Sequence, residues 1–155
     1  MDRIDWAVLA ALEADGRLGY AALGEIVGLS KTPCWTRVQR LEERGVITGY
    51  RADIDRSAVG LPLTAFCEVT VDFAHHHDFE AAIKSHPAVL ECYTTAGQGD
   101  YLLKIVCGDV EHLDTILREQ ISGIPGVVRS SSTIALKSIK QANGIMPFAS
   151  QSRQG

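Results

Sequence analysis

One stretch in the N-terminal third decides the fold: residues 28–50 read GLSKTPCWTRVQRLEERGVITGY. Apolar residues recur there at helical spacing, at Cys34, Val38 and Leu41. Ser30 is a favoured N-cap residue, and Gly45 is typical of the position just past a helix. A shorter helical pattern spans residues 20–27 and ends at the tight turn Gly28-Leu29. Another helical pattern lies before residue 20. Three short helices with this turn predict a helix-turn-helix domain over residues 1–48.

After this domain the hydrophobic period changes from helical to alternating. Residues 49–61 predict an extended linker. The pattern then predicts strand 63–71, helix 78–86, strand 88–96, strand 100–107, helix 110–122 and strand 127–136. This order, βαββαβ, predicts an α+β chain whose second domain, residues 62–140, is a ferredoxin-like split-βαβ sandwich with its helices on one face of an antiparallel sheet.

The ends of the second domain carry two further expectations. The uncovered face of the sheet has apolar side chains such as Phe66, and a second copy of the chain is the simplest cover. Residues 141–155 are polar and are interrupted by Gly144 and Pro147. They predict a flexible tail.

Charge is unevenly distributed along the chain. The formal net charge is −4, yet residues 28–51 contain five basic and two acidic residues, whereas residues 52–155 contain eight and twelve. A phosphate backbone responds to the local patch within a Debye length of about 8–10 Å, so the net charge does not exclude a nucleic-acid partner. No apolar run is long enough to span a membrane. Asp2 and Asp5 stand where a secretory signal would carry Lys or Arg, which predicts a cytoplasmic protein.

The outer face of residues 31–44 is polar and basic. Opposite the apolar side lie hydroxyl, amide and guanidinium groups, at Thr32, Thr36, Gln39 and Arg40. Gln and Arg read adenine and guanine in the major groove, and Trp35 on the rim is typical of an interface. Phosphate contacts are expected from Lys31, Arg37 and Arg44. These residues indicate a DNA-reading helix; the alternative, which composition alone favours, is an ordinary solvated amphipathic helix.

Three motifs resemble those of the Lrp/AsnC (feast/famine) transcription regulators. Residues 28–50 match G-L-S-x-x-P-C-x-x-R-V-x-x-L-E-x-x-G-x-I-x-G-Y, residues 97–103 match G-x-x-D-Y-L-L, and residues 124–127 resemble L-P-G-V. The resemblance covers about residues 1–143. Trp35 and Thr36 replace the aliphatic and acidic residues expected there, which leaves the preferred DNA sequence open.

The resemblance implies function as well as fold. It implies a DNA-binding regulator of amino-acid or nitrogen metabolism genes that responds to a small molecule, and a homodimer that assembles into tetramers or octamers. A dimer presents two reading helices, so the operator is expected to be pseudo-palindromic double-stranded DNA.

The turn Gly97-Gln98-Gly99-Asp100 has chemistry of its own. Two glycines in three residues let the backbone approach a ligand and aim N–H groups at a carboxylate, and Asp100 is suited to pair with an ammonium group. The resemblance implies an amino-acid effector at this turn, between neighbouring dimers, with Thr95, Thr133 and Ile134 close to it. The alternative, which the local sequence favours, is a hairpin turn in which Asp100 bonds its own backbone.

The remaining candidate motifs are weaker. His75-His76-His77 is interpreted as a polar loop, because three consecutive histidines cannot all face one metal ion. The four scattered cysteines are interpreted as buried hydrophobes, and Ser130-Ser131-Ser132 as a polar strand face. We therefore expect no enzyme activity, no cofactor and no metal. The competing class is a metabolite-binding module that docks a protein partner through its N-terminal helices, a role that does not require the basic patch.

Overall fold

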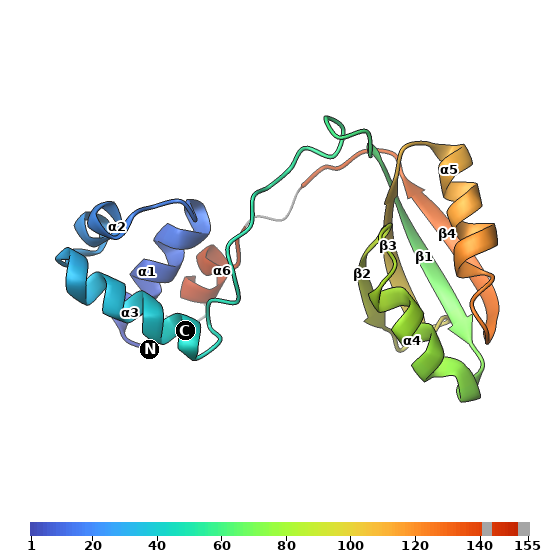
Figure 1. The fold of residues 1–155 in the computed structure, drawn as a ribbon, viewed down its shortest axis with the longest axis horizontal. Coiled ribbons are helices and arrows are strands. Elements are labelled where there is room, and N and C mark those ends of the chain that lie inside the picture. The colour runs from blue at the N-terminus through green and yellow to red at the C-terminus, as the bar shows by residue number, and fades with distance from the viewer. Residues whose placement is uncertain (141–143, 152–155) are drawn as a thin grey trace. The chain divides into compact units, whose positions relative to one another are not determined.

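The chain folds into two compact units. The computed structural model describes residues 1–140 and 144–151 of the 155 residues. Residues 1–53 and the C-terminal segment from residue 140 form the first unit, and residues 54–139 form the second (Figure 1). None of the helices in the described residues is long and apolar enough to cross a membrane.

The first unit is helical. Its helices are α1 (Arg3–Ala14), α2 (Tyr20–Val27), α3 (Lys31–Glu43) and α6 (Met146–Gln151). Asp2 caps α1 by accepting from the N–H groups of Ile4 and Asp5, and the Asp5 carboxylate accepts from the Asp2 N–H in return, which completes a capping box. The core consists of side chains from α1, α2 and α3, namely Val8, Leu23, Cys34, Val38 and Leu41.

A tight turn joins α2 to α3 and gives the helix-turn-helix that the sequence predicts. Gly28 ends α2 with a φ of +74°, a left-handed conformation that suits glycine. The Leu29 N–H donates to the Gly24 carbonyl at 2.8 Å. A β-carbon on Gly24 would lie 2.5 Å from the Leu29 carbonyl oxygen, so the turn can be this close only because residue 24 is glycine.

The second unit is a four-stranded antiparallel sheet with helices on one face (Figure 1). Its elements are β1 (Leu63–Val71), α4 (His76–Lys84), β2 (Val89–Thr94), β3 (Tyr101–Cys107), α5 (Val110–Thr115), which continues as a π-helical segment (Ile116–Ile121), and β4 (Val127–Ala135). The strand order is β2-β3-β1-β4, which leaves β2 and β4 at the edges. The predicted βαββαβ topology is confirmed.

Alternation along the strands decides which face is buried. In β1, Ala65, Cys67, Val69 and Val71 are buried against the helices. Phe66, which lies between Ala65 and Cys67, points to the opposite face of the sheet and is 40% exposed. The core of the second unit therefore lies between the sheet and its two helices, and the opposite face carries exposed apolar surface.

Two local expectations differ from the structure. His75 lies in a short 3₁₀ segment (Phe73–His75), and His76 and His77 open α4 instead of forming a loop. Cys34, Cys67 and Cys107 are buried as expected, but Cys92 is exposed because it lies on the edge strand β2. Among the described residues, no group of three His, Cys, Asp or Glu side chains could hold a metal ion.

Part of the expected flexible tail forms a helix. Residues 141–143 and 152–155 lie outside the described residues, but Met146–Gln151 forms α6, which packs against α1. The N–H groups of Ile145 and Met146 donate to the two carboxylate oxygens of Glu13, each at 2.8 Å, and the Met146 side chain is buried. Pro147 does not prevent the helix because proline is tolerated in a first helical turn.

Gly144 provides a test of this docking. A β-carbon at Gly144 would overlap the Glu13 carboxylate, so Gly144→Ala forces that side chain to turn away from the Ile145 and Met146 amides, and we expect α6 to pack less firmly on α1. The Ile145 and Met146 amides should then lose protection in hydrogen–deuterium exchange. The control is Gly19→Ala, at a site where a β-carbon meets nothing within 4 Å. Equal protection in both variants would contradict the packing of α6 on α1.

Candidate DNA interface and ligand site

The outer face of α3 presents most of the predicted DNA-contacting residues to solvent. Exposed residues are Lys31, Thr32, Trp35, Thr36, Arg40 and Arg44, whereas Arg37 and Gln39 are half-buried. Thr36 Oγ1 donates to the Thr32 carbonyl at 3.1 Å, and Gln39 Nε2 donates to Glu42 Oε2 at 2.8 Å. The face combines hydroxyl, amide, indole and guanidinium groups on one rigid element.

Two arginines of α3 are engaged by carboxylates of α1. Arg37 Nη1 lies 2.7 Å from Asp2 Oδ2 and 2.7 Å from Asp5 Oδ1. Arg40 Nη2 lies 3.0 Å from Asp5 Oδ1 and 3.2 Å from Asp5 Oδ2. Arg37, which the sequence assigned to a phosphate contact, therefore also holds α1 against α3, and the basic patch is less positive than the count over residues 28–51 suggests.

The protonation states follow from these contacts. Burial alone raises the pKa of Asp5, but the Asp2 N–H and the Arg37 guanidinium outweigh it, so the pKa lies below its ordinary value. The Asp5 N–H and the Arg37 guanidinium likewise lower the pKa of Asp2. Hydrogen bonds to Asp2 and Asp5 raise the pKa of Arg37. All three side chains are thus charged at neutral pH.

The turn between β2 and β3 is closed by its own hydrogen bonds. Thr95 Oγ1 donates to the Gly99 carbonyl at 2.6 Å, and the Thr95 N–H donates to the Asp100 carbonyl at 2.9 Å. Asp100 also reaches the neighbouring strand β1: its N–H donates to the Val69 carbonyl, and its Oδ2 accepts from the Val71 N–H at 2.8 Å. The side chain therefore bonds β1 rather than its own turn.

The two glycines of the turn have different roles. Neither Gly97 nor Gly99 has a positive φ, so a left-handed backbone is not the reason for either. A β-carbon on Gly99 would lie 3.3 Å from the Val69 carbonyl oxygen and 3.3 Å from the Glu68 β-carbon, whereas one on Gly97 would meet nothing within 4 Å. Gly99 thus permits close packing on β1, and Gly97 and Gln98 form the exposed tip.

Thr133 and Ile134 do not join this turn within one chain. On β4 they pair with Phe66 and Ala65 of β1, whereas the turn meets β1 at Val69 and Val71. Four strand positions separate Ala65 from Val69, which is about 13 Å along a strand. Of the seven predicted effector residues, the structure brings together the five in the turn: Thr95, Gly97, Gln98, Gly99 and Asp100.

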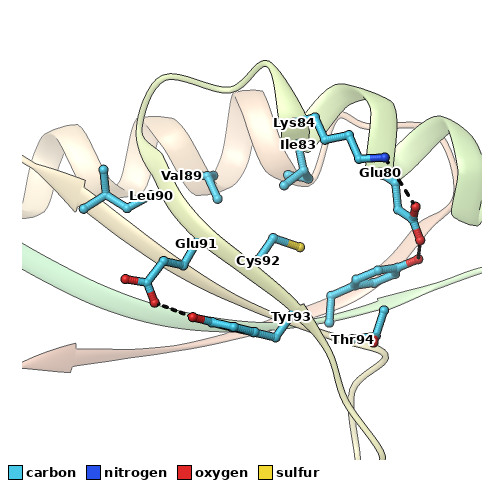
Figure 2. Close-up of a pocket in the computed structure, with 10 residues that line it drawn as sticks. Glu80, Ile83, Lys84, Val89, Leu90, Glu91, Cys92, Tyr93 and Thr94 are labelled. Atoms are coloured by element: carbon cyan, nitrogen blue, oxygen red, sulfur yellow. Dashed lines mark hydrogen bonds and ion pairs between the residues drawn. The ribbon is translucent and has the colours of Figure 1, made fainter. Parts of the chain in front are cut away.

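A groove beside the turn was not predicted from the sequence. It has a volume of about 580 Å³ and lies between α4 and the edge strand β2 (Figure 2). Tyr101 of β3 also lines it. Tyr101 Oη donates to Glu80 Oε1 at 3.0 Å and therefore accepts from His76 Nδ1 at 2.8 Å. Burial and the Glu80 carboxylate raise the pKa of Tyr101 to about 12. Thr94 and Tyr101, which line the groove, directly flank the turn.

The sequence analysis did not predict the ion pairs between α1 and α3, although two sequence patterns point to them. Asp2 and Asp5 stand three residues apart ahead of an apolar helix, which is the spacing of a capping box, and Arg37 and Arg40 share one helix face at the same spacing. The groove has no comparable signal, because His76, Glu80 and Tyr101 meet only through the packing of α4 on the sheet.

An N-terminal helix-turn-helix followed by a separate α+β unit is an architecture of DNA-binding transcription regulators, and two family models match it. The AsnC-type helix-turn-helix domain model matches residues 1–42, and the Lrp/AsnC ligand binding domain model matches residues 64–145. The chain belongs to the Lrp/AsnC family.

Relatives and solved structures agree with this assignment. The chain is 37% identical over 144 residues to a proline dehydrogenase transcriptional activator of Rhizobium radiobacter, covering 91% of this chain and 92% of the relative. It is 34% identical over 150 residues to the DNA-binding transcriptional activator DecR of Escherichia coli, covering 94% and 97%.

Among solved structures, a transcriptional regulator of Neisseria meningitidis in complex with L-methionine superimposes with a TM-score of 0.89. It is 32% identical in sequence, and the match covers 92% of this chain and 94% of that one. A feast or famine regulatory protein of M. tuberculosis complexed with L-methionine gives a TM-score of 0.87 at 35% identity, covering 94% and 99%.

The unequal roles of the turn glycines predict unequal effects on stability. Gly99→Ala places a methyl group against β1, so we expect the free energy of unfolding to fall by about 1–2 kcal/mol, as in an overpacked core. Gly97→Ala should leave it unchanged or raise it by about 0.5 kcal/mol through the unfolded state. Denaturant unfolding of the two full-length variants measures both effects. Equal values would show that the Gly99 contact with β1 is not tight.

Proposed function

We propose that this chain is a sequence-specific transcription regulator that reads DNA with α3. The observation that carries the proposal is the exposed face of α3, where polar, aromatic and guanidinium groups share one rigid helix. Base contacts are assigned to Thr32, Trp35, Thr36, Gln39 and Arg40. Lys31 and Arg44, both exposed, contact phosphates and set the position of the helix on the duplex.

We further propose that an amino acid acts as effector at the β2–β3 turn. Two solved relatives contain L-methionine. With Asp100 Oδ2 held by the Val71 N–H, Oδ1 is the oxygen that would accept from the ammonium group, and the exposed backbone of Gly97 and Gln98 would meet the carboxylate. Thr133 and Ile134 would approach the turn from another copy of the chain.

Assembly of copies follows from the one-sided sheet. The open face carries exposed apolar side chains such as Phe66 and Tyr93, and we propose that a second copy covers it. Dimers would then associate into tetramers or octamers around the effector sites. The two-fold axis of the dimer would give the operator a pseudo-palindromic sequence, and regulation of amino-acid or nitrogen metabolism genes in the cytoplasm is the role proposed for the assembly.

The proposed base contact of Arg40 and the proposed phosphate contact of Arg44 are tested by two separate variants. We expect Arg40→Ala to weaken binding to the operator by about 1–3 kcal/mol and to relax the preference at one base pair, whereas Arg44→Ala should weaken all sequences alike and lower the salt slope by about one unit. Fluorescence anisotropy with operator and scrambled DNA, titrated over a range of salt concentrations, measures both quantities.

Two outcomes would contradict the assignment. If both variants bind as the wild type does, α3 is not the reader. If the wild type retains a metabolite but never distinguishes operator from scrambled DNA, the competing class, a metabolite-binding module that docks a protein partner, becomes the better account.

The effector site is tested by removing one charge. Asp100→Asn keeps an oxygen for the Val71 N–H but removes the charge that would pair with an ammonium group, so affinity for the effector should fall about tenfold or more. Calorimetric titration with the twenty amino acids identifies the ligand and measures the loss. DNA binding without effector should remain as in the wild type.

A matched variant tests the adjoining groove. Glu80→Gln changes a carboxylate on the groove wall in the same way but does not touch the turn. Effector affinity is expected to be unchanged. If Glu80→Gln abolishes binding while Asp100→Asn does not, the effector lies in the groove between α4 and β2 and the turn assignment is wrong.

A further inference from the structure

The carboxylate of Asp5 connects the first helix to the proposed reading helix. It lies in the first turn of α1 and is 1% exposed. Its Oδ1 accepts from Arg37 Nη1 at 2.7 Å and from Arg40 Nη2 at 3.0 Å, and its Oδ2 accepts from the Asp2 N–H at 3.0 Å. One buried charge therefore contacts two guanidinium groups of α3.

This charge keeps the two guanidinium groups together. Arg37 and Arg40 stand one helical turn apart, and both approach the same Oδ1 atom. Without the carboxylate, two like charges would face each other at this distance, and the more exposed of them would turn into solvent. Because the pKa of Asp5 lies below its ordinary value, the carboxylate carries its charge at neutral pH.

The two arginines differ in what remains available to a ligand. Arg37 contacts both Asp2 and Asp5, and its side chain is 24% exposed. The contacts of Arg40 with Asp5 run through Nη2, and its side chain is 51% exposed. A guanidinium has five N–H donors, and each arginine uses one terminal nitrogen for these contacts, Nη1 in Arg37 and Nη2 in Arg40, so other donors remain on both. The greater exposure of Arg40 is what makes its remaining donors available to a base edge.

We propose that Asp5 is a positioning residue that sets DNA specificity through Arg40 without touching DNA. A long arginine side chain loses rotamer freedom when it binds a base, and an ion pair that already holds its direction lowers that cost. The same contact restricts which base edge the guanidinium can reach. The inference rests on the proposed function, in which α3 reads DNA and Arg40 contacts a base.

A double-mutant cycle tests it. The full-length wild type, Asp5→Asn, Arg40→Ala and the double variant are compared by the ratio of dissociation constants for scrambled and operator DNA at one salt concentration. We expect Asp5→Asn to lower this ratio on the order of tenfold, and to have no further effect once Arg40 is Ala, because coupled residues are not additive.

The matched control is Asp2→Asn. It makes the same chemical change three residues away and removes a carboxylate from Arg37, but Asp2 has no contact with Arg40 and asparagine remains a good N-cap. Its specificity ratio should stay within about twofold of the wild type, by the additivity expected of uncoupled sites. An equal loss of specificity in Asp2→Asn and Asp5→Asn would overturn the proposal, because both would then act through the general stability of the domain.

A measurement on the wild type guards against a variant that fails to fold. The Arg40 guanidinium, whose Nη2 contacts Asp5, should show restricted motion when its Nε–H is followed by ¹⁵N relaxation, whereas the exposed Arg44 serves as a mobile reference. Equal mobility of the two side chains would overturn the proposal. The proposal would also be overturned if Arg40→Ala alone lowers specificity and the losses of Asp5→Asn and Arg40→Ala add in the double variant. If Arg40→Ala has no effect on the ratio, the base contact assigned to Arg40 is wrong and the inference falls with it, while α3 as the reader is tested separately by the pair of Arg40 and Arg44 variants.

Discussion

Burial of one carboxylate constrains the whole N-terminal unit. A charge with 1% exposure is costly unless it is paired and hydrogen-bonded, and Asp5 meets that requirement with a backbone N–H of its own helix and two guanidinium groups of α3. The pairing fixes which edge of α3, the one with Arg37 and Arg40, lies against α1. The proposed reading face therefore begins at Arg40 and continues on the side away from the buried Cys34 and Val38.

The second unit depends on a comparable contact at the end of its sheet. β1 continues past its last pairing with β3 at Val69–Tyr101, and its ladder with β4 shifts register at Val71. Asp100 supplies the missing acceptor there, since its carboxylate takes the Val71 N–H. The residue that is proposed to recognise an effector is thus also the residue that closes the sheet. A ligand that engages the remaining oxygen of Asp100 would act directly on the end of β1, which lies in the core of the unit.

The sequence predicts local structure well because periodicity and capping are local. The bounds of β1 and α2 agree with expectation to the residue. What it could not predict depends on long-range contacts: Arg37 with Asp2 across 35 residues, and Val71 with Asp100 across 29. The helix α6 was missed for a related reason. Gly144 was taken for a break, yet it is the residue that lets the chain approach Glu13, a contact that periodicity cannot reveal.

Pairing within the first unit also changes how the regulator must bind DNA. Five basic residues lie within residues 28–51, but Arg37 is neutralised by Asp2 and Asp5, and Arg40 shares the Asp5 charge. Few cations therefore remain for phosphate contacts, and sequence-independent affinity grows with the number of phosphates neutralised. If α3 reads DNA as proposed, a reader with this charge distribution has to obtain a larger share of its affinity from base contacts, and the orientation of a single guanidinium, Arg40, then matters more than it would on a strongly basic helix.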